Sequence, residues 1–201
     1  MKPTTVRIED CAEVRSGFSA KGAIESEPDG AVQVITAQHL RKGEPYLYRE
    51  EHTLRISPSR STEKYHVIPG DILFMSRGAN NYAVLIADIP QPAIAPLTFY
   101  ILKPKANVLS PYLAWCINQE GVRAQLNEIR TGAGTPLIPR REFGEIVIPL
   151  PPLEVQRRIA AVADLQARER SLLHQLVEET ERLHRLTGQQ LLSRLAHDPK
   201  E

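Results

Sequence analysis

The sequence is poor in the residues that build metal centres, disulfide scaffolds and membrane anchors. Its two cysteines, Cys11 and Cys116, stand far apart, and its six histidines form no HxxxH or HExxH pair. A metal site and a disulfide framework are therefore not expected. No apolar run approaches the ~18 residues of a membrane-spanning helix, and the N-terminus carries no apolar stretch behind its charges. These absences predict a reduced, cytoplasmic protein without a membrane segment.

Catalytic motifs are missing as well. The chain has no Gly-rich cofactor loop after a strand, no Gly-Lys-Ser/Thr phosphate loop and no Asn/Asp-Pro-Pro-aromatic motif. Asp29 lacks the Glu-x-Lys that would complete a nuclease motif, and no Ser, His and Asp set sits on a recognisable elbow. The sequence thus disfavours an enzyme, and we expect no catalytic residues and no cofactor in this chain.

What is present fits a globular chain with an uneven charge distribution. The 201 residues are 42% hydrophobic and 24% charged, enough for one domain with an appendage or two small domains. The net charge of +1 argues neither for nor against nucleic acid. Residues 60–141, however, hold nine basic and five acidic residues, and the acid-rich residues 25–51 offset them. This pattern indicates a basic face.

Residues 1 to about 150 read as a mixed, mostly β domain, because turn residues recur at short intervals between apolar runs. Residues 72–75 and 83–87 are expected to form a hairpin around the polar loop SRGANNY. Further expected strands are residues 31–40, 51–58, 97–104 and 146–148.

Residues 110–129 have helical spacing, with Ser110 as the expected N-cap, Pro111 at the first helical position and Gly121 as a candidate break between two helices. The apolar side chains expected to face a core are Leu113, Trp115, Cys116 and Ile117. Residues 130–143 read as a turn-rich loop.

From residue 153 to about residue 195 the chain has no proline and one glycine, Gly188, and good helix formers dominate. Such a long amphipathic helix needs a partner, and the chain is too short to supply a second one. We therefore expect pairing between chains as a coiled coil, although packing on the chain's own domain is the alternative. The expected dimerisation residues, hereafter the seam, are Val162, Leu165, Leu172, Leu176, Leu183 and Leu186.

The stretch GEIVIPLPPLEVQRRIAAVADL, residues 144–165, joins these two parts. A β-branched strand meets Pro149, Pro151 and Pro152 and then becomes helical without a loop. Proline fixes φ, forces the preceding residue into extended conformations and is tolerated in the first helical turn. The joint is therefore expected to hold a fixed angle between a globular module and a long rod, which would let the rod act as a ruler.

This junction resembles that of the specificity (S) subunits of type I restriction-modification enzymes. There a target-recognition domain ends in an I-x-I-P-x-P-P-x-x-x-Q-x-x-I run and enters a spacer helix. The matching residues are Ile146, Ile148, Pro149, Pro151, Pro152, Leu153, Gln156 and Ile159. The segments PGDILFMSRG and TGAGTPLIPRREF also resemble family segments in the same order. The usual member has two recognition domains and two spacer helices, so this chain resembles a half-subunit.

The resemblance implies an α+β fold, with a target-recognition domain over residues 1–150 and a spacer helix for dimerisation and methyltransferase docking over residues 151–201. It further implies a non-catalytic homodimer that reads a bipartite, inverted-repeat target in double-stranded DNA. The expected partners are methyltransferase (M) subunits, which carry S-adenosylmethionine, and a restriction/motor (R) subunit. The competing interpretation is a coiled-coil adaptor or transcription regulator with a protein-binding head.

DNA contact is predicted first for the SRGANNY loop, because Arg pairs with guanine, Asn pairs with adenine and Gly lets the backbone approach closely. The alternative is a plain hairpin turn. The RTGAGTP loop comes second, as a phosphate-binding segment or a simple connector. Four further basic residues in loops are candidates for phosphate contacts. The full candidate set is Ser76, Arg77, Gly78, Asn80, Asn81, Tyr82, Arg130, Thr131, Gly132, Arg15, Lys21, Arg41 and Lys42.

Overall fold

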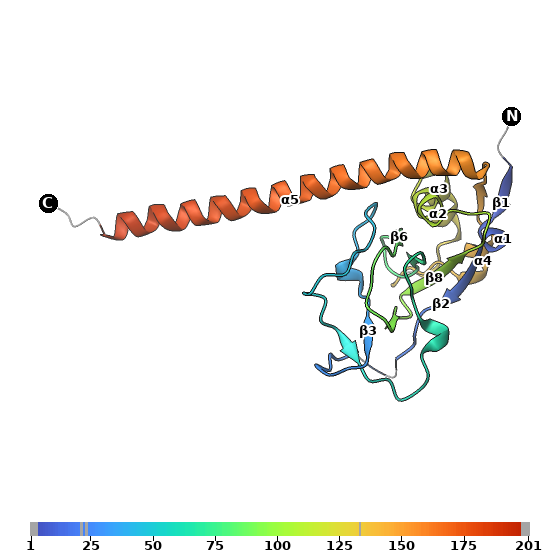
Figure 1. Cartoon of the computed structure of the whole chain (residues 1–201), viewed down its shortest axis with the longest axis horizontal. Coiled ribbons are helices and arrows are strands. Elements are labelled where there is room, and N and C mark those ends of the chain that lie inside the picture. Colours follow the sequence, from blue (N-terminus) through green and yellow to red (C-terminus); the bar gives the residue numbers. More distant parts are fainter. Residues whose placement is uncertain (1–3, 21, 23, 133, 198–201) are drawn as a thin grey trace.

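A single long helix, α5 (Leu153–His197), runs out from a mixed, mostly β head, as Figure 1 shows. The computed structural model describes residues 4–197 except residues 21, 23 and 133. The candidate Lys21 therefore lies outside the described residues. The expected α+β class and the long C-terminal helix are confirmed. No helix among the described residues is long and apolar enough to cross a membrane.

Three small sheets build the head. One pairs β1 (Thr5–Arg7) with β9 (Val147–Pro149), which brings the start of the chain beside the start of α5 (Figure 1). The central antiparallel sheet has the order β2 (Ala12–Ser16), β8 (Phe99–Pro104), β5 (Ile72–Met75), β6 (Ala83–Leu85). The third has the order β4 (Arg55–Ile56), β3 (Val32–Val34), β7 (Ala93–Ile94), with β3 antiparallel to β4 and parallel to β7.

Both faces of the central sheet are covered, because strand side chains alternate between the two faces. Phe74 of β5 stacks on Phe143 at 4.3 Å between ring centroids, in a core shared with the helices. Its neighbour Leu73 points into a second core beside Tyr46 and Ile86. The short helices are α1 (Ile8–Cys11), α2 (Ser110–Ile117), α3 (Glu120–Ile129) and α4 (Arg140–Glu145), with 3-10 turns at η1 (Ala37–His39) and η2 (Glu63–Tyr65).

Several sequence-based expectations need correction. The β5–β6 hairpin is confirmed, but the expected strands over residues 31–40 and 51–58 shrink to β3 and β4, and part of the expected loop over residues 130–143 is helix α4. Residues 110–129 do form two helices. The break falls at Asn118, where the helix α2 is capped, and Gly121 lies inside the first turn of α3.

The helix α2 begins one residue earlier than its sequence suggests. Its N-cap is Leu109, not Ser110, and no side-chain hydroxyl caps it. The reason is tertiary: the buried Gln156 of α5 accepts the Leu109 N–H at 2.9 Å. Trp115 is also only half-buried, at the side of α2 that lies along α5.

The proline joint is clamped onto α2 by hydrogen bonds. Tyr112 of α2 donates its hydroxyl to the carbonyl of Pro149 at 2.7 Å. The amide nitrogen of Gln156 donates to the carbonyls of Pro151 and Asn107, at 2.9 and 3.1 Å. Because the prolines lack N–H groups, their carbonyls provide the polar contacts that fix this joint. The angle of α5 is thus held by tertiary contacts as well as by the stiffness of proline.

A second contact between head and helix lies further along α5. Arg170 Nη2 donates to the carbonyl of Gly43 at 2.5 Å, and His174 Nδ1 lies 2.7 Å from Glu44 Oε1. One turn later Glu178 pairs with Arg41 at 3.0 Å. We call this set of three contacts the brace. No local pattern in the sequence predicts these contacts.

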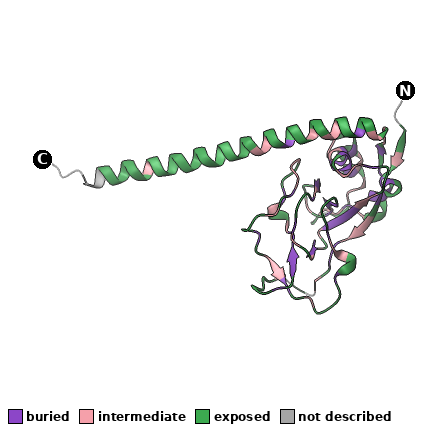
Figure 2. Cartoon of the chain, viewed as in Figure 1, coloured by how far each residue is buried: buried purple, intermediate pink, exposed green. Residues whose placement is uncertain are grey.

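The seam lies on the opposite side of α5 from the head. Figure 2 shows that most of the helix is exposed. Ala167 is buried on the side of the helix that faces the head. Successive residues of a helix are rotated by about 100° about its axis. On this measure the three brace residues of α5 lie within about 60° of Ala167, whereas the seam residues lie roughly 100–220° from Ala167. All six seam residues are 54–65% exposed. Packing of the seam on the chain's own head is therefore excluded.

Candidate nucleic-acid interface

The hairpin loop between β5 and β6 is folded by two of its own polar side chains. Ser76 is buried and donates its hydroxyl to the carbonyl of Thr98 at 2.9 Å. Asn81 is buried and donates its amide to the carbonyl of Met75, also at 2.9 Å. These two candidates shape the loop from inside, so their side chains do not face solvent.

The exposed residues of the loop are Arg77, Ala79 and Asn80, with the half-buried Gly78 between them. The side chains of Arg77 and Asn80 are exposed, and no hydrogen bond to the described residues engages either guanidinium or amide. Gly78 has φ of +94°, a left-handed conformation that suits glycine and turns the chain at the tip. Arg and Asn are the side-chain types that read purine edges in the major groove, and this loop exposes one of each.

The second predicted loop lies directly beside the first. The N–H of Gly78 donates to the carbonyl of Pro136 at 2.8 Å, and Ile138 N–H donates to Ser76 at 2.8 Å. Arg130 Nη2 then donates to Asn81 Oδ1 at 2.9 Å. Two segments about 50 residues apart, each predicted independently, therefore form one surface.

Within this second loop the roles differ. Thr131 is exposed, but its hydroxyl and its backbone both bond to Leu137, which closes the loop on itself. Gly132 is exposed and has φ of +90°, so it turns the chain as a glycine can. Thr131 and Gly132 therefore set the shape of the loop beside Arg130.

Tyr82 and Lys42 link this surface to a third segment. The hydroxyl of Tyr82 donates to the carbonyl of Leu40 at 3.2 Å, and burial raises the pKa of this phenol. Lys42, two residues further along, lines a cavity of about 230 Å³ together with residues of the hairpin loop and of α3. The α3 residues Arg123 and Asn127, which were not among the sequence-based candidates, line this cavity too. The charge of Arg123 within the basic stretch was the one available signal.

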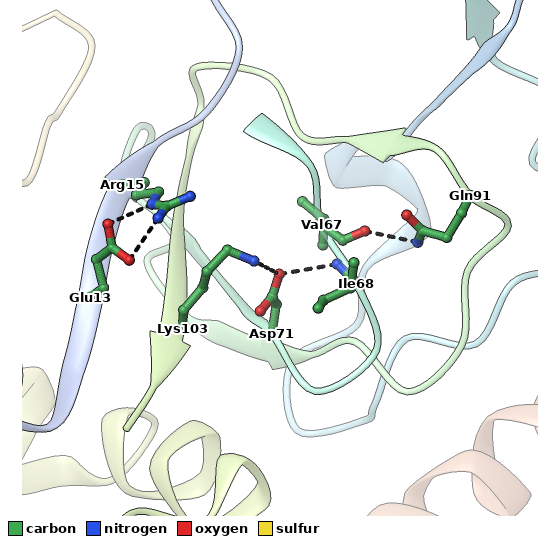
Figure 3. A network of polar contacts seen from close by, with 7 residues as sticks. All are labelled: Glu13, Arg15, Val67, Ile68, Asp71, Gln91 and Lys103. Atoms are coloured by element: carbon green, nitrogen blue, oxygen red, sulfur yellow. Dashed lines mark hydrogen bonds and ion pairs between the residues drawn. The ribbon is translucent and has the colours of Figure 1, made fainter. Parts of the chain in front are cut away.

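The remaining basic candidates have partners elsewhere. Arg15 on β2 donates two hydrogen bonds to Glu13, at 2.6 and 2.8 Å (Figure 3). This pairing lowers the pKa of the Glu13 carboxyl and raises that of the Arg15 guanidinium. Arg41 is engaged in the brace with Glu178. Neither residue joins the surface formed by the two loops.

The Gly-Asp pair of the PGDILFMSRG segment has a structural role. Figure 3 shows that Asp71 Oδ2 accepts the backbone N–H of Ile68 at 3.0 Å and pairs with Lys103 Nζ at 2.7 Å. Nearby, Gln91 Nε2 donates to the carbonyl of Val67 at 2.9 Å. The carboxylate therefore closes the turn before β5 and ties it to β8.

The cysteines are buried in the core beside the helices, and burial raises the pKa of Cys11 to about 11 and also raises that of Cys116. Thiols of this kind are not nucleophiles near neutral pH. No group of three or more His, Cys, Asp or Glu side chains suited to a metal ion occurs in the part of the chain that the structure describes.

Comparison with known proteins agrees with this architecture. The family described as "Type I restriction modification DNA specificity domain" matches residues 2–181. The specificity subunit of the type I restriction enzyme MjaIX from Methanocaldococcus jannaschii is 28% identical over 158 residues, which are 78% of this chain and 36% of that protein.

Two crystal structures share the fold. The S subunit from M. genitalium has a TM-score of 0.65 at 14% identity, over 96% of this chain and 49% of that one. The HsdS subunit from Thermoanaerobacter tengcongensis has a TM-score of 0.56 at 20% identity, over 86% of this chain and 39% of that one. The chain thus spans half or less of the length of these relatives. Since the family match covers most of its residues, the chain belongs to the family of type I restriction-modification DNA specificity domains.

Proposed function

We propose that this chain is the DNA-recognition component of a type I restriction-modification complex and acts as a homodimer. Each head reads one half of a bipartite, inverted-repeat target, and α5 sets the distance between the halves. The observation that carries this proposal is the seam, a row of exposed apolar side chains that points away from the head of its own chain. A stripe of this kind needs a covering partner in water.

A second copy is the partner that best fits the seam. The six residues recur at heptad-like intervals, the pattern by which identical helices pack knobs into holes. A two-fold axis between two copies relates the heads, so each head meets the same sequence on opposite strands. The 45 residues of α5 span about 67 Å, which limits the separation of the heads to about 20 base pairs.

The hairpin loop is the part of each head that we assign to base reading. Its exposed Arg77 and Asn80 are suited to guanine and adenine edges, while the adjoining Arg130 is positioned for phosphate contact. The chain itself supplies no catalysis and no cofactor. S-adenosylmethionine belongs to the M subunits of such systems. We propose that M subunits dock on α5 and an R subunit joins them, in the cytoplasm.

Substitution of the seam tests the pairing. Leu176→Lys combined with Leu183→Lys places charge on the seam and is expected to convert a dimer to a monomer in sedimentation equilibrium. Leu192→Lys is the matched control, because Leu192 is 69% exposed but lies on the head-facing side of the helix, beyond the brace. A double variant that sediments like the unmodified chain would reject the seam as the dimer contact.

DNA recognition is tested with the full chain and the M subunit of its host system. Sequence-dependent methylation that disappears when this chain is omitted supports the proposal. The binding constant should fall steeply with salt concentration, because phosphate neutralisation releases counterions. A protein-binding adaptor would show no such dependence, and methylation that ignores sequence would contradict the assignment.

A further inference from the structure

A small cavity with an unbalanced positive charge lies where three segments of the head meet. It has a volume of about 230 Å³. The hairpin loop forms one wall, α3 forms another, and Lys42 reaches it from the segment that also carries the brace. The lining residues on which the argument depends are Lys42, Tyr82, Arg123, Asn127 and Arg130.

Three of these residues are cations, and none of the described lining residues is acidic. The pKa of Lys42 is lowered, first by partial desolvation of the amine and second by the nearby Arg123 guanidinium. The two cations therefore repel each other across the cavity. Within the described residues neither Lys42 nor Arg123 forms an ion pair that would offset this charge.

Arg130 adds donors to the same cavity. Its Nη2 holds Asn81, whereas its Nε is buried and has no hydrogen-bond partner among the described residues. Buried polar atoms are rarely left without a partner, so Arg130 retains hydrogen-bonding capacity beyond its contact with Asn81. Asn127 contributes a further amide whose NH₂ group can donate.

We propose that this cavity binds one phosphate of the DNA backbone, next to the bases that Arg77 and Asn80 contact. The proposal rests on the proposed function. A phosphate fits better than a base, because three of the described lining residues are cationic and none is acidic. Phosphate contacts fix the register of a protein on the duplex without reading sequence.

The test compares Arg123→Gln and Lys42→Gln with the unmodified chain, each in complex with the M subunit. Arg123 and Lys42 are both exposed, so the fold should be retained. Each variant is expected to weaken binding of cognate and non-cognate duplexes equally. The slope of log K against log salt should become shallower by about 0.9, the value for one lost phosphate contact. The matched control, Arg49→Gln, removes an exposed arginine outside the cavity and should leave the slope unchanged.

Three outcomes overturn the proposal and leave the proposed function intact. In the first outcome, the slope of log K against log salt in both variants equals that of the unmodified complex, and the unmodified complex still selects its target. Alternatively, the preferred sequence changes, which would assign a base contact. Thirdly, titration with inorganic phosphate shows Arg123-dependent binding while the DNA slope is unaffected, which would assign a free-anion site. An unmodified complex without sequence preference would instead reject the proposed function.

Discussion

Arg41 Nη2 lies 3.0 Å from Glu178 Oε1, and this ion pair joins the head to α5 across 137 positions of sequence. Both side chains are well exposed, so the pair alone adds about 0–1 kcal/mol to stability. Its significance is geometric. Together with Arg170 and the proline joint it gives the helix two separate attachments to the head, and two attachments define an orientation.

Loss of Arg170 should therefore loosen the angle between head and helix. Arg170→Ala removes the hydrogen bond to the carbonyl of Gly43 and leaves the proline joint intact. Spin labels on the head and near Thr187 should report a broader distance distribution by pulsed electron resonance. Arg168→Ala is the matched control, because Arg168 is exposed and, among the residues that the structure describes, forms an ion pair only with Asp164 of its own helix. An unchanged distribution in Arg170→Ala would mean that the contact of Arg170 with Gly43 is not needed to hold the angle.

The joint itself depends on Gln156. Gln156→Ala would leave the Leu109 N–H and the carbonyls of Asn107 and Pro151 without this partner in a buried site. Each unsatisfied buried group costs about 1–3 kcal/mol, so we expect a total loss of about 3 kcal/mol in the free energy of unfolding. Urea denaturation measures this. The control Gln166→Ala is exposed and should change the value by less than about 0.5 kcal/mol. A loss below about 1 kcal/mol in Gln156→Ala would contradict the clamp.

The two exposed residues of the hairpin loop should control sequence choice. Arg77→Ala or Asn80→Ala is expected to cost about 1–3 kcal/mol of discrimination at one position of the target, with the fold retained. Methylation mapping in the reconstituted complex would show a relaxed base at that position. Asn81→Ala should instead lower the melting temperature, because its buried amide folds the loop. Unchanged target patterns in the first two variants would favour a plain hairpin turn.

Stability should fall in mild acid because of two stacked histidines. The rings of His39 and His52 lie 3.9 Å apart, and Tyr46 bonds to His52 Nδ1 at 2.9 Å. Burial lowers the pKa of both imidazoles, and for His52 the neighbouring His39 and Arg49 lower it further. Burial also raises the pKa of Tyr46 to about 12, so its hydroxyl can donate to the neutral ring.

Because both folded-state pKa values lie below the unfolded value of about 6.5, the unfolded chain binds more protons in this range. The stability that these groups contribute is present above pH about 6.5 and is lost as the pH falls below it. Urea denaturation between pH 7.5 and 5.5 should show this decrease, and His39→Gln should make it smaller. A decrease of the same size in His39→Gln would assign the effect to other groups.

Sequence alone predicted the elements that local patterns determine. Helical periodicity predicted α5 and grouped Leu176 with the other seam residues, and turn chemistry predicted the β5–β6 hairpin. Long-range contacts left no local pattern. Nothing in the spacing of Arg41 and Glu178 indicates that they meet, and Ser110 is displaced as the cap by Gln156, 46 positions away.

The candidate site was predicted in part for the same reason. Residue type selected Arg77, Asn80 and Arg130, which the fold brings onto one surface. Residue type alone could not distinguish these three residues from Ser76, whose buried hydroxyl donates a hydrogen bond that stabilises the loop. Nor could it place Arg123, because the packing of α3 beside the hairpin loop is a tertiary event.

The central claim is that α5 measures the distance between two half-sites, and a change in helix length tests it most directly. A heptad inserted after Glu181 lies beyond the brace and keeps the seam in phase. In an antiparallel pair it should part the heads by about 10 Å, or about three base pairs. Methylation mapping of this variant should show the same half-sites with a gap two to three base pairs longer. Full activity on the original spacing would contradict the account.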